Sequence, residues 1–270
     1  SRFWLPNLLQ SDHPCSVESK MIPILFTVGD IPIYSSPFFL ATGILAGLAM
    51  GWVEARRVGI SDRQFHLFWI SAVPLALVFA ALNAWVFEVG IANVLPNIGS
   101  IEYSGLVSFG AILAVLLWGY IYARITKLPA RLILDTVSTV LPLILCIYRI
   151  GCILTGCCYG LETDGFLGLF LPGRNGAWAY RYPTQIMLFT LNLVIFAWLW
   201  WRRRRKSWAG QQVLLFLLAY SLGRLVIDAL RDLPRVFGPF SLHQLTAIAI
   251  MLIASYTAFE LWRGRRTSEM

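Results

Sequence analysis

Two arginines lie inside strongly apolar stretches of this chain. Arg149 follows a run of Leu, Ile and Val residues, and Arg224 lies within a second such run. A charged side chain at membrane depth costs roughly 2.5 to 3.5 kcal/mol on insertion scales, so such residues usually have a functional role. A guanidinium group presents a planar fork of N–H donors that fits a phosphate or a carboxylate. The two arginines therefore predict a binding site for an anion.

Residues of both signs follow Arg224 at helical spacing. Asp228 lies four residues later and Arg231 three residues after that, so all three can share one face of a helix. Two interpretations are open here. Either the guanidinium groups hold a phosphate or carboxylate together with Arg149, or Arg224 and Asp228 form an internal pair that only connects helices.

Three of the five cysteines gather within residues 151–160, which read GCILTGCCYG. This is not a common zinc spacing and no histidine is near in the sequence, so no metal site and no cofactor are predicted. Three interpretations are open: small apolar packing, a disulfide from Cys152 to Cys157 or Cys158, or a thiolate activated by Arg149. His243, farther along the chain, is either a catalytic base or a polar anchor at a helix start.

The composition indicates a membrane protein that crosses the bilayer several times. The chain is 58% hydrophobic and 13% charged, with a mean hydropathy of +0.68, which no soluble domain of this size shows. The expected fold class is all-α with seven transmembrane helices. They are predicted at residues 36–52, 65–89, 105–123, 133–153, 185–201, 211–230 and 242–262.

The basic residues predict how these spans are oriented. Of the 22 Lys and Arg, 14 lie in loops 53–64, 124–132 and 202–210 and in the C-terminal tail, while the opposite side has six. The positive-inside rule then places the N-terminus outside and the C-terminus in the cytoplasm. This rule also accounts for the net charge of +8, so nucleic-acid binding is not predicted. Residues 1–20 form a polar arm without an assigned role, and residues 21–270 form the transmembrane domain.

Both arginines are expected in the outer half of the bilayer. Arg149 lies 17 residues beyond position 132 and Arg224 lies 14 residues beyond position 210. These separations correspond to roughly 25 and 21 Å along a helix axis, against a hydrocarbon core of about 30 Å. A single cavity that opens toward the outer leaflet can therefore receive both side chains.

Five local patterns, in order along the chain, resemble the bacterial prolipoprotein diacylglyceryl transferase family. Residues 103–110 (YSGLVSFG) resemble the segment with the family's His-Gly-Gly motif, and residues 148–160 resemble its Gly-Arg-hydrophobic-Gly-Asn signature. Residues 181–185 (RYPTQ) resemble Arg-His-Pro-Ser-Gln. Residues 220–231 resemble the arginine-rich sixth helix, and residues 241–244 (SLHQ) resemble the start of the last helix.

The resemblance implies an enzyme of the bacterial inner membrane that moves a diacylglyceryl group from phosphatidylglycerol to a cysteine thiol. The acceptor implied is a lipobox-containing preprolipoprotein, and Arg149 and Arg224 would hold the lipid phosphate and stabilise the leaving group. The candidate catalytic residues are Arg149, Arg224, Cys152, Cys157 and His243. The candidate substrate-binding residues are Gly151, Gly160, Arg181, Gln185, Asp228, Arg231 and Gln244.

The chain also departs from the family pattern. Phe109, which cannot accept a proton, replaces the motif histidine, and Cys152 and Cys157 replace the signature asparagine and an acidic residue. Asp228 stands where the family has Glu. A divergent transferase is the leading hypothesis. The alternatives are a homologue that binds or transports phospholipid without turnover, and a membrane thiol oxidoreductase that uses the clustered cysteines.

Overall fold

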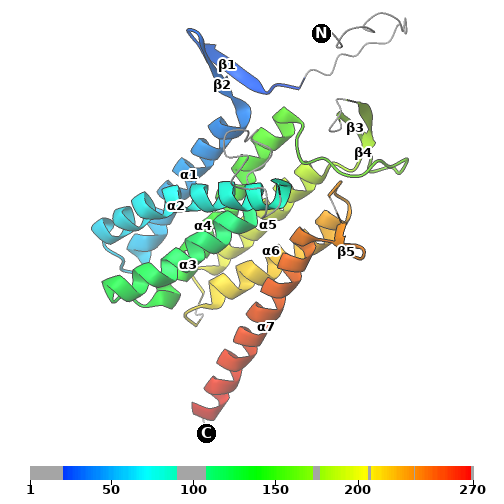
Figure 1. The fold of residues 1–270 in the computed structure, drawn as a ribbon. Coiled ribbons are helices and arrows are strands. Elements are labelled where there is room, and N and C mark those ends of the chain that lie inside the picture. The colour runs from blue at the N-terminus through cyan, green and yellow to red at the C-terminus, as the bar shows by residue number, and fades with distance from the viewer. Residues whose placement is uncertain (1–20, 90–107, 173–176, 206–207, 234, 269–270) are drawn as a thin grey trace, which may run out of the picture.

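The structure is a computed structural model in which residues 21–89, 108–172, 177–205, 208–233 and 235–268 are described. Long helices form a bundle, and short strands form three hairpins beside it (Figure 1). The helices are α1 Ser35–Arg57, α2 Asp62–Val89, α3 Ser108–Thr126, α4 Ala130–Thr155, α5 Thr184–Arg202, α6 Gln211–Ala229 and α7 Leu242–Ser268. The strands are β1 Ile24–Val28, β2 Ile31–Tyr34, β3 Leu169–Pro172, β4 Trp178–Arg181, β5 Arg235–Phe237 and β6 Phe240–Ser241.

The predicted set of transmembrane helices is confirmed. Within the described ranges, seven helices are long and apolar enough to cross a membrane, and each overlaps one predicted span. Observed and predicted ends differ by a few residues in most spans, as expected for frayed helix ends. The predicted start of the third span, at residue 105, lies outside the described residues. The protein is therefore mainly helical and spans the membrane several times.

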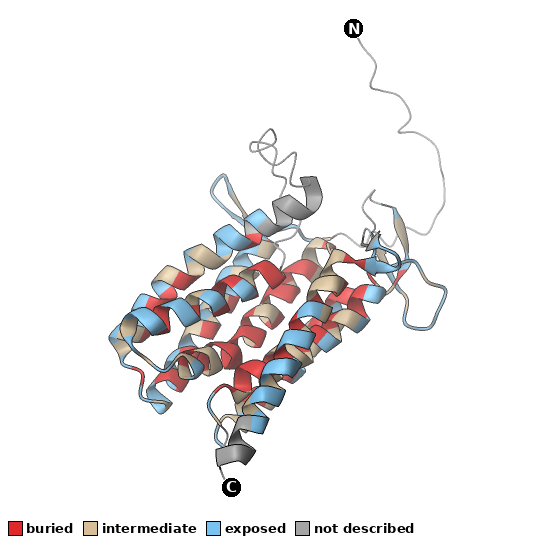
Figure 2. Cartoon of the chain, turned by 60° about the horizontal axis from the view of Figure 1, so that its bottom comes forward, coloured by how far each residue is buried: buried red, intermediate tan, exposed pale blue. Residues whose placement is uncertain are grey.

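Helix α4 is the centre of the bundle. Of its span, 67% is buried, compared with 17% for α7, which packs at the edge of the bundle against α6. In Figure 2 the buried residues accordingly concentrate on the inner helices, and the outer helices show exposed faces. Because Arg149 lies on α4, its charge is in the interior of the protein and does not face lipid.

Helix α1 approaches α4 closely because three glycines repeat at every fourth position. A Cβ atom added to Gly43 would lie 2.9 Å from the Ile144 carbonyl oxygen, and one added to Gly47 would collide with the Ile144 side chain. Gly51 completes the stripe opposite Val140. Small residues at this spacing let transmembrane helices pack backbone to backbone. This contact fixes the helix that carries Arg149.

The three hairpins lie at one end of the bundle and were not predicted from the sequence. They are the antiparallel pairs β1–β2, β3–β4 and β5–β6, which precede α1, connect α4 to α5, and precede α7 (Figure 1). Large apolar side chains are exposed on them, including Ile31, Phe170 and Phe237. This end also receives the C-terminal ends of α4 and α6, where the candidate site lies.

The arginine-rich loops meet at the opposite end of the bundle. Arg203, after α5, places Nε 3.2 Å from the Glu54 carboxylate near the end of α1. Asp135, near the start of α4, accepts hydrogen bonds from the backbone N–H groups of Gly210 at 2.6 Å and Val213 at 3.0 Å. Because the first N–H groups of a helix lack internal partners, this carboxylate anchors the start of α6.

Candidate functional site

Three charged side chains at the end of α6 form a buried network. Arg224 donates from Nε to the Asp228 carboxylate at 2.9 Å, and Arg231 donates from Nη1 to its other oxygen at 3.2 Å. The prediction that these three residues share one face is thus confirmed. The Arg224–Asp228 pair, which was the alternative to anion binding, is also present. The network is incomplete, however, because Nη1 of Arg224 and Nε of Arg231 are buried without a hydrogen-bond partner among the described residues.

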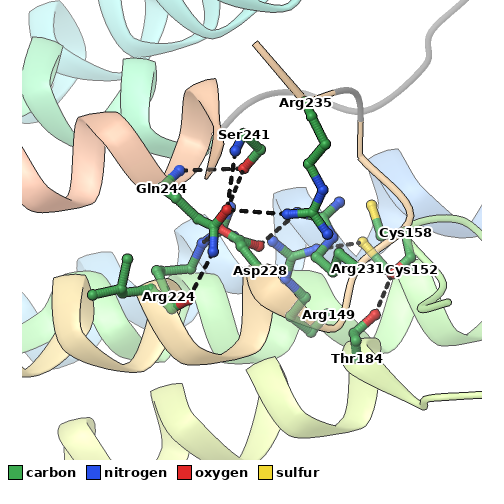
Figure 3. Close-up of polar contacts among 11 residues, drawn as sticks. Arg149, Cys152, Cys158, Thr184, Arg224, Asp228, Arg231, Arg235, Ser241 and Gln244 are labelled. Carbon is green, nitrogen blue, oxygen red and sulfur yellow. Dashed lines mark hydrogen bonds and ion pairs between the residues drawn. The ribbon is translucent and has the colours of Figure 1, made fainter. Parts of the chain in front are cut away.

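Arg149 reaches the same region from α4. Its side chain is buried, and its Nη1 lies 3.6 Å from the Cys152 sulfur one turn later. Arg149 is also within electrostatic range of Cys158 and of Tyr220, which precedes Arg224 by one turn on α6. Figure 3 shows the Arg149 and Arg231 side chains near the two labelled cysteines. The predicted meeting of α4 and α6 at one charged region is therefore present in the fold.

The three clustered cysteines bring their sulfur atoms together. The Sγ atoms of Cys152, Cys157 and Cys158 all lie within 4.8 Å of one another, and the cysteines described in this structure are free thiols. Cys152 belongs to the last turn of α4. Gly156 then ends the helix with a left-handed φ of +70°, which turns the chain so that the next two cysteines face the first. No other group of cysteine, histidine and carboxylate side chains suited to a metal occurs in the described ranges.

The loop that carries Cys157 and Cys158 is held in a strained conformation. Cys158 has a φ of +63°, a left-handed value that costs a residue with a Cβ atom on the order of 1 kcal/mol or more. Two neighbours from the start of α5 hold it there. Thr184 donates its hydroxyl to the Cys158 carbonyl at 2.7 Å, and Gln185 donates its amide to the Cys157 carbonyl at 2.9 Å. Gln185 thus has a positioning contact, and Thr184 was missed by the sequence analysis.

The sulfur atoms have unequal affinities for protons. Hydrogen bonds from Cys152 and Cys157, together with the positive charges of Arg231 and Arg149, hold the pKa of the Cys158 thiol well below its usual value. Hydrogen bonding to Cys152 and Cys158, followed by burial, raises the pKa of Cys157. The cluster therefore favours a negative charge on sulfur beside the buried guanidinium groups.

His243 and Gln244 lie at the start of α7, next to the α6 network. His243 is within electrostatic range of Arg224, Asp228 and Arg231, as predicted from its position in the sequence. The Gln244 side-chain oxygen accepts from the Ser241 backbone N–H at 3.0 Å, and the Gln244 backbone N–H donates to the Ser241 hydroxyl oxygen at 3.4 Å. This reciprocal pair is a capping box, whose Ser-x-x-Gln signal is visible in the sequence.

Gln244 also makes hydrogen bonds to residues of two other elements. Its carbonyl oxygen accepts from Arg235 Nη1 at 3.2 Å, and its amide donates to the Leu225 carbonyl at 3.3 Å (Figure 3). The Leu225 contact ties α7 to α6, and the Arg235 contact ties α7 to β5. Arg235 was not predicted as a site residue, because its contact joins two different elements, whereas Ser241 was missed although its signal is local.

The remaining predicted residues frame the site through packing. A Cβ atom on Gly151 would lie 2.9 Å from the Ser36 Cα atom of α1, and one on Gly160 would lie 2.5 Å from the Tyr182 carbonyl oxygen. Both glycines therefore permit close backbone approach. Arg181 pairs with Glu162 at 2.6 Å.

The comparisons with known proteins agree with this architecture. The sequence profile of the prolipoprotein diacylglyceryl transferase family matches residues 23–259. The chain belongs to this family. It is 28% identical to the phosphatidylglycerol–prolipoprotein diacylglyceryl transferase of Clostridioides difficile over 226 residues, which are 83% of this chain and 89% of that protein. The same-named protein of Dehalococcoides mccartyi is 28% identical over 265 residues, 93% and 97% of the two chains. That of Listeria innocua is 26% identical over 240 residues, 86% and 87% of the two chains.

The resemblance seen in the five sequence patterns is thus confirmed at the level of the family. In this family member, the position that the resemblance gives to a histidine is Phe109. Its buried ring lies 5.1 Å from the Arg224 guanidinium carbon and makes an edge-to-face contact with Tyr220 at 5.4 Å. An aromatic face attracts a guanidinium group, but it can neither accept nor donate a proton. Phe109 therefore packs against the Arg224 guanidinium group.

An apolar cavity of about 90 Å³ lies between α1, α2, α3 and α4. Its lining is almost entirely hydrocarbon and includes Ile44, Val73, Ala111 and Leu141. Tyr148 is among its lining residues, and the Tyr148 ring lies 5.7 Å from the Arg149 guanidinium carbon. None of the residues that line the cavity belongs to the charged network.

Proposed function

We propose that this protein transfers a diacylglyceryl group from a phospholipid, phosphatidylglycerol, to the thiol of a cysteine in a preprolipoprotein that carries a lipobox. The chain is a member of a transferase family, and its relatives named above are phosphatidylglycerol–prolipoprotein diacylglyceryl transferases. The single observation that supports this function best is the group of buried guanidinium groups contributed by α4 and α6.

The charge of this group favours an anionic substrate. Arg149, Arg224 and Arg231 are buried, and the carboxylate paired with Arg224 and Arg231 is that of Asp228, so these four groups have a net charge of +2 before any charge on the cysteine sulfur atoms is counted. Uncompensated charge in a protein interior is unfavourable. A phosphodiester supplies one negative charge and accepts hydrogen bonds from guanidinium forks. The unpartnered N–H groups of Arg224 and Arg231 are suitable donors for it.

The apolar cavity offers hydrocarbon contacts to only a short part of a lipid tail, because its volume is about 90 Å³. Its lining includes Tyr148, which precedes Arg149 in the sequence, so a lipid whose tail contacts this lining would have its headgroup near the guanidinium groups. A lipid bound in this way would present its phosphate to the guanidinium groups and its glyceryl carbon to the thiol acceptor. When the carbon–oxygen bond breaks, the same guanidinium groups would stabilise the charge that develops on the departing glycerol phosphate.

The distribution of basic residues supports a reaction at the outer face of the cytoplasmic membrane. The arginine-rich loops and the C-terminal end of α7 lie at one end of the bundle, and the site lies at the other (Figure 1). With the basic end in the cytoplasm, the site opens on the extracytoplasmic side.

The test is transfer in reconstituted membranes. Purified protein in liposomes receives phosphatidylglycerol with labelled acyl chains and a lipobox peptide, and we expect labelled peptide together with free glycerol phosphate. Arg149→Met and Arg224→Met should each lower the rate about 100-fold or more, as the loss of a transition-state donor does. Arg204→Met, which removes an exposed arginine at the opposite end, is the matched control.

Two results would count against the proposal. One is the absence of labelled peptide with the unmodified protein, and bound lipid without turnover would then favour a lipid-binding homologue. The other is an Arg149→Met variant that is as active as Arg204→Met, because this would show that the buried guanidinium groups do not act on the phosphate.

A further inference from the structure

The three clustered thiols have the arrangement of a set of metal ligands. Tetrahedral zinc with thiolate ligands at about 2.3 Å requires sulfur atoms roughly 3.8 Å apart. The Sγ atoms of Cys152, Cys157 and Cys158 lie within 4.8 Å of one another, so small side-chain rotations suffice to bring them to that spacing. The turn at Gly156 sets this geometry, which the residue spacing alone did not reveal.

Buried positive charge lies beside the cluster. Arg149 is buried, and its Nη1 lies 3.6 Å from the Cys152 sulfur. A hydrogen bond from a guanidinium group to a metal-bound thiolate is the kind of outer contact that orients a ligand and offsets its charge. Zn²⁺ with three thiolates has a net charge of −1. Together with a phosphodiester, it balances the +2 of the three buried arginines and Asp228.

We propose that Cys152, Cys157 and Cys158 bind one Zn²⁺ ion and leave its fourth position open for the thiol of the acceptor cysteine. The metal role rests on the proposed transferase function. Three protein ligands with one open position are typical of catalytic zinc sites. Phe109 cannot remove a proton from the acceptor, whereas a thiol that binds zinc is deprotonated outright. The site therefore replaces a general base with a metal ion.

The transfer step balances with these groups. On binding the metal, the acceptor thiol releases its proton to solvent, and its sulfur becomes a bound thiolate. The sulfur donates an electron pair to the glyceryl carbon attached to the phosphate, and a carbon–sulfur bond forms. The carbon–oxygen bond to the phosphate breaks, and its electron pair stays on that oxygen. Glycerol phosphate leaves with one more negative charge than the phosphodiester had, which equals the charge of the released proton.

The metal site is tested without reference to activity. The full chain, purified in detergent under anaerobic conditions with a phosphine reductant, is stripped of metal and titrated with Co²⁺ as a spectroscopic substitute for Zn²⁺. We expect one equivalent to bind, with thiolate-to-cobalt charge-transfer absorption. Alanine substitution of Cys152, Cys157 or Cys158 should each reduce this absorption by about one third or more and weaken binding about 100-fold, a tenfold loss being about 1.4 kcal/mol.

Cys146 provides the matched control. It is a buried cysteine on α4 outside the cluster, so Cys146→Ala should leave the cobalt spectrum and the affinity unchanged. Should Cys152→Ala fail to fold, Cys157→Ala, at a partly exposed position, supplies the same readout. The metal site is refuted when the unmodified chain binds no cobalt through sulfur, or when mass mapping shows a stable disulfide among the three cysteines in protein purified without reductant.

The acceptor role has its own readout. Addition of a lipobox peptide to the cobalt-loaded protein should strengthen the charge-transfer absorption, because a fourth thiolate joins the metal, whereas a peptide with serine in place of cysteine should not. Transfer activity that survives complete metal removal overturns the inference and leaves the proposed function intact. A cobalt site that responds to the peptide in a protein without transfer activity supports the site and contradicts the proposed function.

Discussion

The substitution Asp228→Asn should destabilise the protein strongly. The Asp228 carboxylate is fully buried and accepts from Arg224 at 2.9 Å and from Arg231 at 3.2 Å. Each hydrogen bond to a charged group contributes about 1.5 to 3 kcal/mol. Asparagine retains one acceptor oxygen, so one bond is lost and the other is weakened. The expected loss is about 3 kcal/mol, close to the 3 to 5 kcal/mol measured when a buried pair is broken.

The measurement is unfolding in mixed micelles with increasing SDS, followed by tryptophan fluorescence, since the chain has 11 tryptophans. A loss of about 3 kcal/mol corresponds to roughly a 100-fold change in the unfolding equilibrium. Asp62→Asn is the control. Asp62 also pairs with an arginine, Arg56, at 2.6 Å, but both side chains are about half exposed, so its removal should matter far less.

The reasoning is refuted if the two asparagine variants unfold at the same SDS fraction. Equal behaviour would mean that the Arg224–Asp228–Arg231 network does not experience an apolar interior. It would also remove the argument that the three buried arginines need an external anion for charge balance.

Three further predictions follow from particular contacts. Gly160→Ala should greatly reduce the yield of folded, monodisperse protein, because the new Cβ would lie 2.5 Å from the backbone oxygen of Tyr182; a normal yield would contradict the packing. Asp135→Ala should lower the unfolding free energy by about 1 kcal/mol, since it removes the anchor at the start of α6; an unchanged SDS midpoint would exclude this role. Phe109→Leu should lower the unfolding free energy by roughly 1 to 2 kcal/mol in the same assay, because it removes the ring that packs against Arg224; equal stability would show that this contact does not stabilise the protein.

Hydropathy and the local period of a helix account for what was predicted correctly. Seven apolar stretches were visible in the sequence because each must cover the hydrocarbon core with its own backbone hydrogen bonds. The Arg224–Asp228 contact was also predictable, since residues four apart on a helix are neighbours. Both results depend only on residues close together in the chain.

The short hairpins and the supporting contacts were not predictable in this way. Strands of two to five residues beside apolar spans do not differ from span ends in hydropathy. The contacts of Thr184 with Cys158 and of Arg235 with Gln244 join different elements. The Ser241–Gln244 capping box, by contrast, has a local signal in the sequence.

The sequence by itself determined that this chain is a seven-span membrane protein with buried cations near one end of its spans, because burial cost and charge distribution act on each segment separately. Only the tertiary structure decided that Arg149, from α4, lies beside the thiols that also face Arg231, from the end of α6. These residues are about 80 positions apart in the chain. Their proximity results from how closely helices pack around α4 and from the left-handed turn at Gly156, neither of which hydropathy specifies.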